Sequence, residues 1–471
     1  MFRSALLILS GNAAASLLLL ARNLIVARLI SMEDYGIAAT FAITMAVVEM
    51  ASQLGLQQQI VQAKDGEDPR FQAALQGFQV LRGVIAGVLL FLAAGWIAQF
   101  LGIPEVAWAY QVMALVPVFN ALQHFDIHRL NRQMRFWPMV LTGAVPALIS
   151  LITIWPLYVW FGDYRVMLWA IIVQIGLMMV VSHLVAERPY RIVLDRAIMA
   201  GSLRFGWPLL VNGMLMFAVF NGDKLIVGRV LGMETLAIFA MGFTLTLTPT
   251  LVMAKSAQNF FLPQLSAAAS GAGFQFLSMV TMQAILVMGV SIVVGIALIG
   301  APLIQGLLGD KYAALIPFMI WLAIMQAVRV GKAGPALVAL AVGQTTNTMI
   351  ANLIRVMVLP VCWYVAVTTG DLVVIIWVAT LGEVLGYIAS LLLVRIRLTI
   401  SLRGLVLPLV GLLVLMWVCI WFANRRATGQ GSVTLLLAEL ALYALLIAAI
   451  LWSCRDLRCY IINRHTNAVE S

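Results

Sequence analysis

The chain has 471 residues, of which 63% are hydrophobic and 10% are charged, and its formal net charge is +10 at pH 7. A soluble globular domain carries about a quarter charged residues, so this composition excludes that class and indicates a protein whose solvent is the lipid bilayer. The Lys and Arg residues are spread over separate segments and form no single patch with interleaved aromatics, so we expect no nucleic-acid partner.

Transmembrane helices are predicted along the whole chain, because windows of about 20 apolar residues follow one another with short connections. We therefore expect an all-α, polytopic membrane protein with about fourteen transmembrane helices. The predicted spans are residues 5–30, 35–57, 75–101, 107–124, 138–161, 165–186, 204–230, 236–255, 274–301, 313–330, 337–366, 371–394, 404–423 and 432–453. Prolines inside these spans can each bend a helix, because each removes an internal hydrogen bond. They are Pro117, Pro146, Pro156, Pro208, Pro249, Pro317 and Pro360.

An internal repeat organises the chain. The segment LIVARLISMEDYGI at residues 24–37 recurs as LIVGRVLGMETLAI at residues 225–238, with seven of fourteen positions identical. Six predicted spans precede the second copy, so both copies have the same orientation, as in secondary transporters built from parallel repeats. The predicted domains are a six-helix bundle at 1–200, a second at 201–400, and two additional helices with a cytoplasmic tail at 401–471.

The distribution of basic residues predicts the orientation. Nineteen Lys and Arg residues fall on one side of the predicted spans and six on the other, which places both termini in the cytoplasm. Arg329 and Lys332 are expected on the cytoplasmic side, at the end of the span at 313–330 and in the connection that follows it. The first apolar run resembles a signal peptide, but it corresponds to an internal span in the repeat, so we expect it to be retained. Four basic residues are expected at membrane depth, namely Arg22, Arg82, Lys224 and Arg355.

Arg22 and Lys224 occupy equivalent helices of the two repeats, about 12 to 14 Å below the outer end at about 1.5 Å per residue. If these helices face each other, the two cations form a paired site for a phosphate or diphosphate. In the alternative, Lys224 pairs with Asp223 or another acid, while Arg22 extends to the interface or meets Glu49.

Other charged residues at membrane depth allow two interpretations each. Arg355 and Glu383 lie at equal depth on consecutive helices, which predicts an ion pair that acts as a structural lock or a coupling element. Arg82, near the cytoplasmic end of its span, extends to the interface or guards the inner mouth. Glu49 could carry a proton for coupled transport or be a partner of Arg22.

Six further polar residues could line a polar path or hydrogen-bond between helices. They are Asn12, Asn212, Asn221, Gln174, His183 and Asn352. The cysteines, Cys362, Cys419, Cys454 and Cys459, form no CxxC pair, so no disulfide framework, metal site or cofactor is expected.

The segments ARLISMEDYGIAA, QLGLQQQIV and NGDKLIVGRVLGMETLAIFAMG resemble polysaccharide transporters, the lipid-linked oligosaccharide flippase branch of the multidrug/oligosaccharidyl-lipid/polysaccharide exporter superfamily. The resemblance implies a bacterial inner-membrane protein that is not an enzyme. It implies the movement of an undecaprenyl-diphosphate-linked oligosaccharide repeat unit to the periplasmic face for exopolysaccharide, capsule or O-antigen synthesis, by alternating access of two bundles. The partners that it implies are this lipid-linked substrate, membrane lipids, and polysaccharide polymerase and export proteins. The cationic cavity of the family carries over to Arg22, Lys224, Arg82 and Arg355.

Two other functions are compatible with parts of the pattern. A multidrug or metabolite exporter of the same fold, driven by H⁺ or Na⁺, needs titratable acids within a bundle. A membrane glycosyltransferase needs an external acidic pair, for which Glu33 and Asp34 are candidates. Because the repeat replaces Asp34 with Thr235, this pair is better interpreted as a turn and helix cap.

Overall fold

The structure is a computed structural model that describes residues 2–52, 54–63, 65–269, 271, 273–427 and 433–469. All regular elements in these ranges are helices, which confirms the predicted all-α class. Twelve helical segments in the described part are long and apolar enough to cross a membrane, so the chain is a polytopic membrane protein. The helices α1 (Phe2–Leu29) and α2 (Met32–Ser52) are not among those twelve, and the expected count of fourteen is therefore not confirmed.

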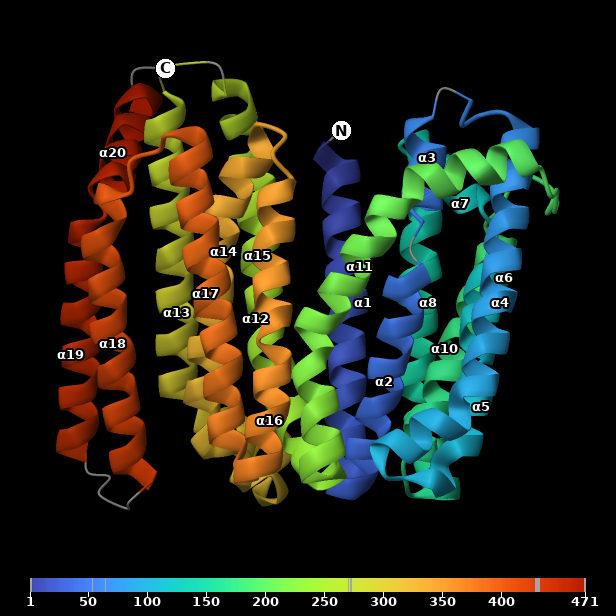
Figure 1. The fold of residues 1–471 in the computed structure, drawn as a ribbon, viewed down its shortest axis with the longest axis horizontal. Helices are drawn as coiled ribbons and strands as arrows, with labels where there is room; N and C mark the ends of the chain where they lie inside the picture. Colours follow the sequence, from blue (N-terminus) through green and yellow to red (C-terminus); the bar gives the residue numbers. More distant parts are fainter. Residues whose placement is uncertain are drawn as a thin grey trace. The chain divides into compact units, whose positions relative to one another are not determined.

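The chain divides into two compact units, Met1–Ala237 and Ile238–Ser471. Figure 1 shows each unit as a bundle of helices, coloured blue to green in the first and yellow-green to red in the second. The first unit includes α11, which packs against α2 and α4 of the same unit. The domain boundaries predicted from the repeat, at residues 200 and 400, stay a prediction about the duplication.

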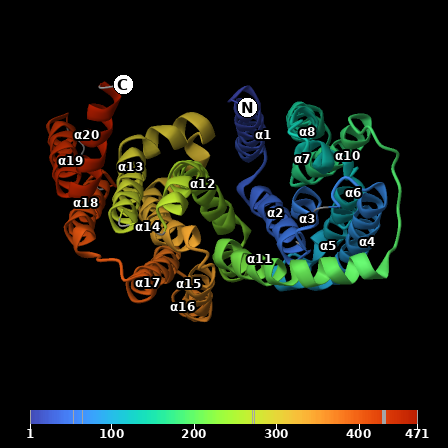
Figure 2. The same cartoon turned by 90° about the horizontal axis from the view of Figure 1, so that it is seen from above.

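The first unit contains α1, α2 and a set of helices joined by short connections. These are α3 (Leu56–Gln62), α4 (Pro69–Leu101), η1 (Pro104–Val106), α5 (Ala107–Met113), α6 (Leu115–Leu122), α7 (Asp126–Arg132), α8 (Trp137–Ile152), α9 (Ile154–Phe161), α10 (Arg165–Leu184), α11 (Arg196–Leu231) and the start of α12 (Met233–Ala268). The helix α4 packs on α5 and α6, and α8 packs on α1 and α10. Figure 2 shows α4, α5 and α6 side by side at one edge of the unit.

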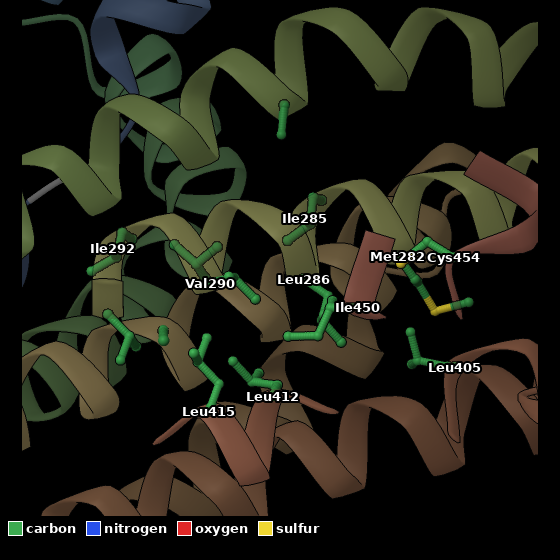
Figure 3. Close-up of a cluster of buried hydrophobic side chains, with 14 of the residues drawn as sticks. Met282, Ile285, Leu286, Val290, Ile292, Leu405, Leu412, Leu415, Ile450 and Cys454 are labelled. Carbon is green, nitrogen blue, oxygen red and sulfur yellow. The ribbon is translucent and has the colours of Figure 1, made fainter. Parts of the chain in front are cut away.

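The second unit contains the rest of α12 and the following elements. These are α13 (Phe274–Leu308), η2 (Asp310–Leu315), α14 (Ile316–Ala341), α15 (Thr346–Met357), α16 (Leu359–Thr369), α17 (Leu372–Leu398), α18 (Arg403–Ala427), α19 (Val433–Ser453) and α20 (Arg455–Val469). Its apolar core joins Ile285 and Leu286 of α13 to Leu412 of α18 and Ile450 of α19 (Figure 3). Cys454 is part of this core, and the segment expected as a tail forms α20, which packs on α13.

Three predicted spans are broken into two helices shortly before a proline. The breaks lie at Ala114 before Pro117, at Thr153 before Pro156, and at Val358 before Pro360. A proline ring displaces the carbonyl four residues earlier and cannot donate a hydrogen bond, so the helix is interrupted within the preceding turn. The predicted bending is therefore realised as a helix break at these three sites.

Two helix boundaries differ from the prediction in ways that matter for function. The helix α4 begins at Pro69 instead of residue 75, because Asp68 caps it by accepting from the backbone N–H groups of Arg70 and Phe71. The helix α14 continues to Ala341, so the expected loop around residues 331–336 was wrong. Both changes move charged residues from helix ends into helix interiors.

Candidate functional site

A cavity of about 500 Å³ lies within the first unit and is lined by residues of α2, α3, α4, α6, α7, α10 and α11. Its polar lining consists of Glu49, Gln57, Gln58, Gln79, Arg82, Asn120, Gln123, His128 and Asn212. The remaining lining is mostly Met, Leu and Val side chains. A concave site with a few convergent polar groups in an apolar bundle is the usual form of a small-molecule or head-group site.

The structure brings Glu49 and Arg82, two of the predicted functional residues, to this one cavity. Arg82 lies thirteen residues after Pro69, which places it about 20 Å along α4 and not at its end. The longer α4 therefore moves Arg82 away from the helix end where the sequence placed it. Arg82 is half-buried and Glu49 is exposed, so a bound solute can reach both side chains.

Close packing of small residues forms two walls of the cavity. A Cβ atom at Gly206 of α11 would lie 2.3 Å from the carbonyl oxygen of Leu54, and one at Gly213 would lie 2.3 Å from that of Met50. On the other side, a Cβ atom at Gly83 of α4 would lie 2.1 Å from the Cβ atom of Ala121. Small residues permit this backbone approach in membrane bundles, so the glycines determine how α11 and α4 enclose the cavity.

Amide side chains of α4 compensate for the break between α6 and α7. Gln79 donates to the carbonyl oxygens of Asn120 and Ala121, both at 3.3 Å. Gln76 donates to the Ala121 and Gln123 carbonyls at 3.2 Å and accepts from the Phe125 N–H at 2.8 Å. Carbonyl groups at an interrupted helix end need such partners, because they lack the hydrogen bonds of a continuous helix. Neither glutamine was among the residues expected from the sequence, although their spacing of three along an apolar helix is a detectable signal.

An ion-pair cluster lies on α7, the helix that contributes His128 to the cavity. Asp126 is fully buried, and Arg129 donates to its two oxygens at 2.5 and 3.2 Å. Burial by itself would raise the pKa of Asp126, but the bonds from Arg129 and from the backbone N–H groups of Glu187 and Arg188 lower it to about 2. Burial lowers the pKa of His128 to about 4, so its imidazole adds no charge to the cavity at neutral pH.

Arg22 is buried and donates from Nη1 to Ser150 Oγ at 3.1 Å and to Gln174 Oε1 at 2.5 Å. Its two hydrogen-bond partners therefore lie on α8 and α10, and both are neutral. Lys224 is half-buried on α11, next to the buried Asp223. The structure thus accounts for the burial of Arg22 through α8 and α10, while its pairing with Lys224 around a ligand stays a prediction.

The second unit contains a buried charged cluster that includes Arg355 and Glu383. Arg355 Nη2 forms an ion pair with Glu383 Oε1, as the sequence predicts. Arg329 donates hydrogen bonds to the same oxygen, from Nε at 2.8 Å and from Nη2 at 2.5 Å. Lys332 Nζ donates to Asn352 Oδ1 at 2.9 Å. The expected position of Lys332 in a connection between spans was wrong, because it lies within α14, and Arg329 and Lys332 are both less than 10% exposed.

The other polar residues take several roles. Asn212 lines the cavity, Gln174 binds Arg22, and Asn352 accepts from Lys332 and from Arg355 Nη1. His183 is exposed and its Nδ1 lies 2.9 Å from the Met179 carbonyl oxygen. The side chain of Asn12 lies outside the described residues. Within the described residues, no group of three His, Cys, Asp or Glu side chains could hold a metal ion.

Comparison with known protein families gives one match that covers more than half of the chain. The model described as "Polysaccharide biosynthesis protein" matches residues 25–317. This range includes α2, all residues that line the cavity, and α11. It does not include Arg22. A comparison with curated proteins gives no match.

Solved structures share the fold over most of their length. The lipid II flippase MurJ in an inward closed conformation has a TM-score of 0.72 and 15% identity, over 97% of this chain and 100% of that chain. An inward-facing multidrug resistance MATE family transporter of the MOP superfamily has a TM-score of 0.63 and 16% identity, over 82% and 94%. A MOP superfamily transporter from Pyrococcus furiosus has a TM-score of 0.55 and 16% identity, over 84% and 95%. These likenesses show that the chain has the fold of MOP superfamily transporters.

Proposed function

Because the chain belongs to the polysaccharide biosynthesis protein family, we propose that it is a flippase and not an enzyme. Its substrate is an undecaprenyl-diphosphate-linked oligosaccharide repeat unit, which it moves from the cytoplasmic to the periplasmic face of the bacterial inner membrane. The product serves the synthesis of exopolysaccharide, capsule or O-antigen. The likeness to a lipid II flippase supports a lipid-linked substrate.

The observation that carries the proposal is the polar cavity within the first unit. A diphosphate with several sugars cannot cross hydrocarbon unaided, because its charges and hydroxyl groups would lose their water. The cavity offers Arg82 to the diphosphate and the amides of Asn120 and Asn212 to sugar hydroxyls. Its volume of about 500 Å³ lies within the range of ordinary ligand pockets.

Of the four cations proposed for the head group, Arg82 has the strongest structural support, because it lines the cavity. Arg22 is bound by Ser150 and Gln174, and Arg355 is bound by Glu383 and Asn352. These contacts favour a positioning role for Arg22 and an ion-pair role for Arg355 in the resting protein. Lys224 keeps its proposed role beside Arg22, and alternating access of two bundles is the proposed movement.

A reconstitution experiment tests the proposal. Purified protein in liposomes should move a fluorescent polyprenyl-diphosphate oligosaccharide across the bilayer, and Arg82→Ala should slow this movement by tenfold or more, roughly the value of one lost charge-assisted bond. Arg395→Ala, an exposed arginine near the end of α17, is the matched control and should move the substrate at the normal rate. Movement no faster than in protein-free liposomes would remove the proposal.

The second candidate, an H⁺- or Na⁺-coupled exporter, is favoured by one observation, the position of Glu49 at the cavity. A carboxyl group there could exchange a cation during transport. An imposed pH or Na⁺ gradient should then drive efflux of cationic dyes from the liposomes, and Glu49→Gln should stop it. Gradient-independent movement of the lipid-linked oligosaccharide that persists in Glu49→Gln supports the flippase without coupling through Glu49.

The cellular setting follows from the same proposal. We place the protein in the inner membrane with both termini in the cytoplasm, since basic residues concentrate on that side of the predicted spans. Polysaccharide polymerase and export proteins are its proposed partners, together with membrane lipids. In cells, Arg22→Ala combined with Lys224→Ala should abolish export of the surface polysaccharide while the amount of protein in the membrane stays normal.

A further inference from the structure

The buried cluster of the second unit carries more positive than negative charge. Arg329, Lys332 and Arg355 are 7%, 9% and 6% exposed, and Glu383 is 4% exposed. Arg329 and Arg355 each form an ion pair with Glu383. Three cations against one carboxylate leave an excess of two positive charges among α14, α15 and α17.

Hydrogen-bond donors also outnumber acceptors in this cluster. Both guanidinium groups use the same carboxylate oxygen, Glu383 Oε1. Lys332 Nζ has three N–H donors, and its described hydrogen bond goes to Asn352 Oδ1, which also accepts from Arg355. Two further buried atoms of the cluster have no hydrogen-bond partner among the described residues, the side-chain nitrogen of Gln326 and the second carboxylate oxygen, Glu383 Oε2.

The surroundings make such an imbalance costly. The cluster lies in the interior of α14 and α17, which are predominantly apolar, candidate membrane-spanning helices. Lys332 interacts electrostatically with both guanidinium groups as well as with Glu383. Like charges at close range in a poorly hydrated interior repel strongly, so the cluster is stabilised by any species that supplies negative charge.

We propose that this cluster is a binding site for a small inorganic anion of the size of chloride, held by Lys332 together with Arg329 and Arg355. The anion accepts the remaining Lys332 N–H groups and reduces the excess charge from two to one. The depth of the cluster selects for size, because a diphosphate bearing sugars cannot enter among side chains that are less than 10% exposed. The site is distinct from the cavity of the first unit, and the inference does not depend on the proposed flippase function.

Chloride dependence of stability tests the site, because a ligand that binds the folded state raises the unfolding temperature. The purified protein in detergent is unfolded thermally in gluconate and in chloride buffers at equal ionic strength and pH. Replacing gluconate by about 0.15 M chloride should raise the midpoint by roughly 2 to 4 °C. The same unfolding midpoint in gluconate and in chloride would overturn the proposal. A midpoint that rises with pH but not with chloride would also overturn it, since Lys332 would then lose its proton instead of gaining a partner.

Two substitutions of lysine separate the site from general salt effects. Lys332→Met should abolish the chloride shift and should be at least as stable as the natural protein in gluconate, because it removes one uncompensated charge from the interior. Lys255→Met, which removes an exposed lysine on α12, should keep the full shift. A chloride shift of equal size in Lys332→Met would also overturn the proposal, and a labelled-chloride binding measurement on the same samples gives an independent readout.

Discussion

Arg329 donates two hydrogen bonds to one oxygen of Glu383, from Nε at 2.8 Å and from Nη2 at 2.5 Å, across 54 positions of sequence. The bonds join α14 to α17, two helices that are in extensive contact. Glu383 is almost completely buried, and Arg355 of α15 binds the same oxygen. The carboxylate therefore links three helices of the second unit.

Glu383→Gln should destabilise the second unit strongly. The amide keeps the shape of the side chain but leaves three buried cations without a counter-charge, and breaking a buried ion pair on one side costs about 3 to 5 kcal/mol. Thermal unfolding in detergent should show a much lower midpoint for this variant. Glu234→Gln, at an exposed position, is the control and should change stability by less than about 0.5 kcal/mol. Equal midpoints for the two variants would contradict a structural role of Glu383.

The partner of Glu383 shows what the sequence can and cannot predict. Equal depth on consecutive helices is enough to predict the pair of Arg355 and Glu383. The place of Arg329 and Lys332 is not predictable in the same way, because charges near Gly331, Gly334 and Pro335 resemble a loop. Only the tertiary contacts to α15 and α17 make it favourable to bury them inside α14.

The cavity of the first unit also depends on contacts that the sequence alone does not reveal. Hydropathy identifies the spans, and Arg82 and Glu49 are visible as charges at membrane depth. Their shared cavity depends on the glycine contacts of α11 and on the early start of α4 at Pro69, which involve positions far apart in the sequence. Local patterns therefore predict which residues are candidates, and packing decides which of them meet.

The hydrogen-bonding geometry of the Arg82 guanidinium group can be tested separately from its charge. Arg82→Lys keeps one positive charge but loses the planar, bidentate donor pair that matches a phosphate. We expect it to recover part of the liposome transport that Arg82→Gln loses, with the order natural protein, then Lys, then Gln. Unfolding midpoints measured in parallel show whether both variants remain folded. Transport by Arg82→Gln at the natural rate would exclude Arg82 from head-group binding.

Two glycines of the same helix should respond to alanine with opposite signs. A Cβ atom at Gly213 would lie 2.3 Å from the Met50 carbonyl oxygen, whereas one at Gly201 meets nothing within 4 Å. Gly213→Ala should therefore destabilise by about 1 to 3 kcal/mol through overpacking. Gly201→Ala should be neutral or stabilise by up to roughly 1 kcal/mol, because alanine favours the helix. Unfolding midpoints that shift in the same direction would argue against close contact between α2 and α11.

Asp126→Asn should destabilise the polar end of the first unit in a pH-dependent way. The folded pKa of Asp126 is lowered to about 2, against about 4 in an unfolded chain, so its stabilising effect is complete above about pH 4 and is lost as the pH falls toward 2. At neutral pH the variant should lose roughly 2 to 4 kcal/mol, because Arg129 and the Glu187 N–H lose their charged acceptor. Its unfolding midpoint should approach that of the natural protein as the pH falls from about 4 to about 2, where Asp126 itself becomes protonated.

Asp65→Asn, which changes an exposed acid near the start of α4, is the matched control and should have the same unfolding midpoint as the natural protein at every pH. A constant difference between Asp126→Asn and the natural protein over this range would show that packing, and not charge, determines the role of Asp126.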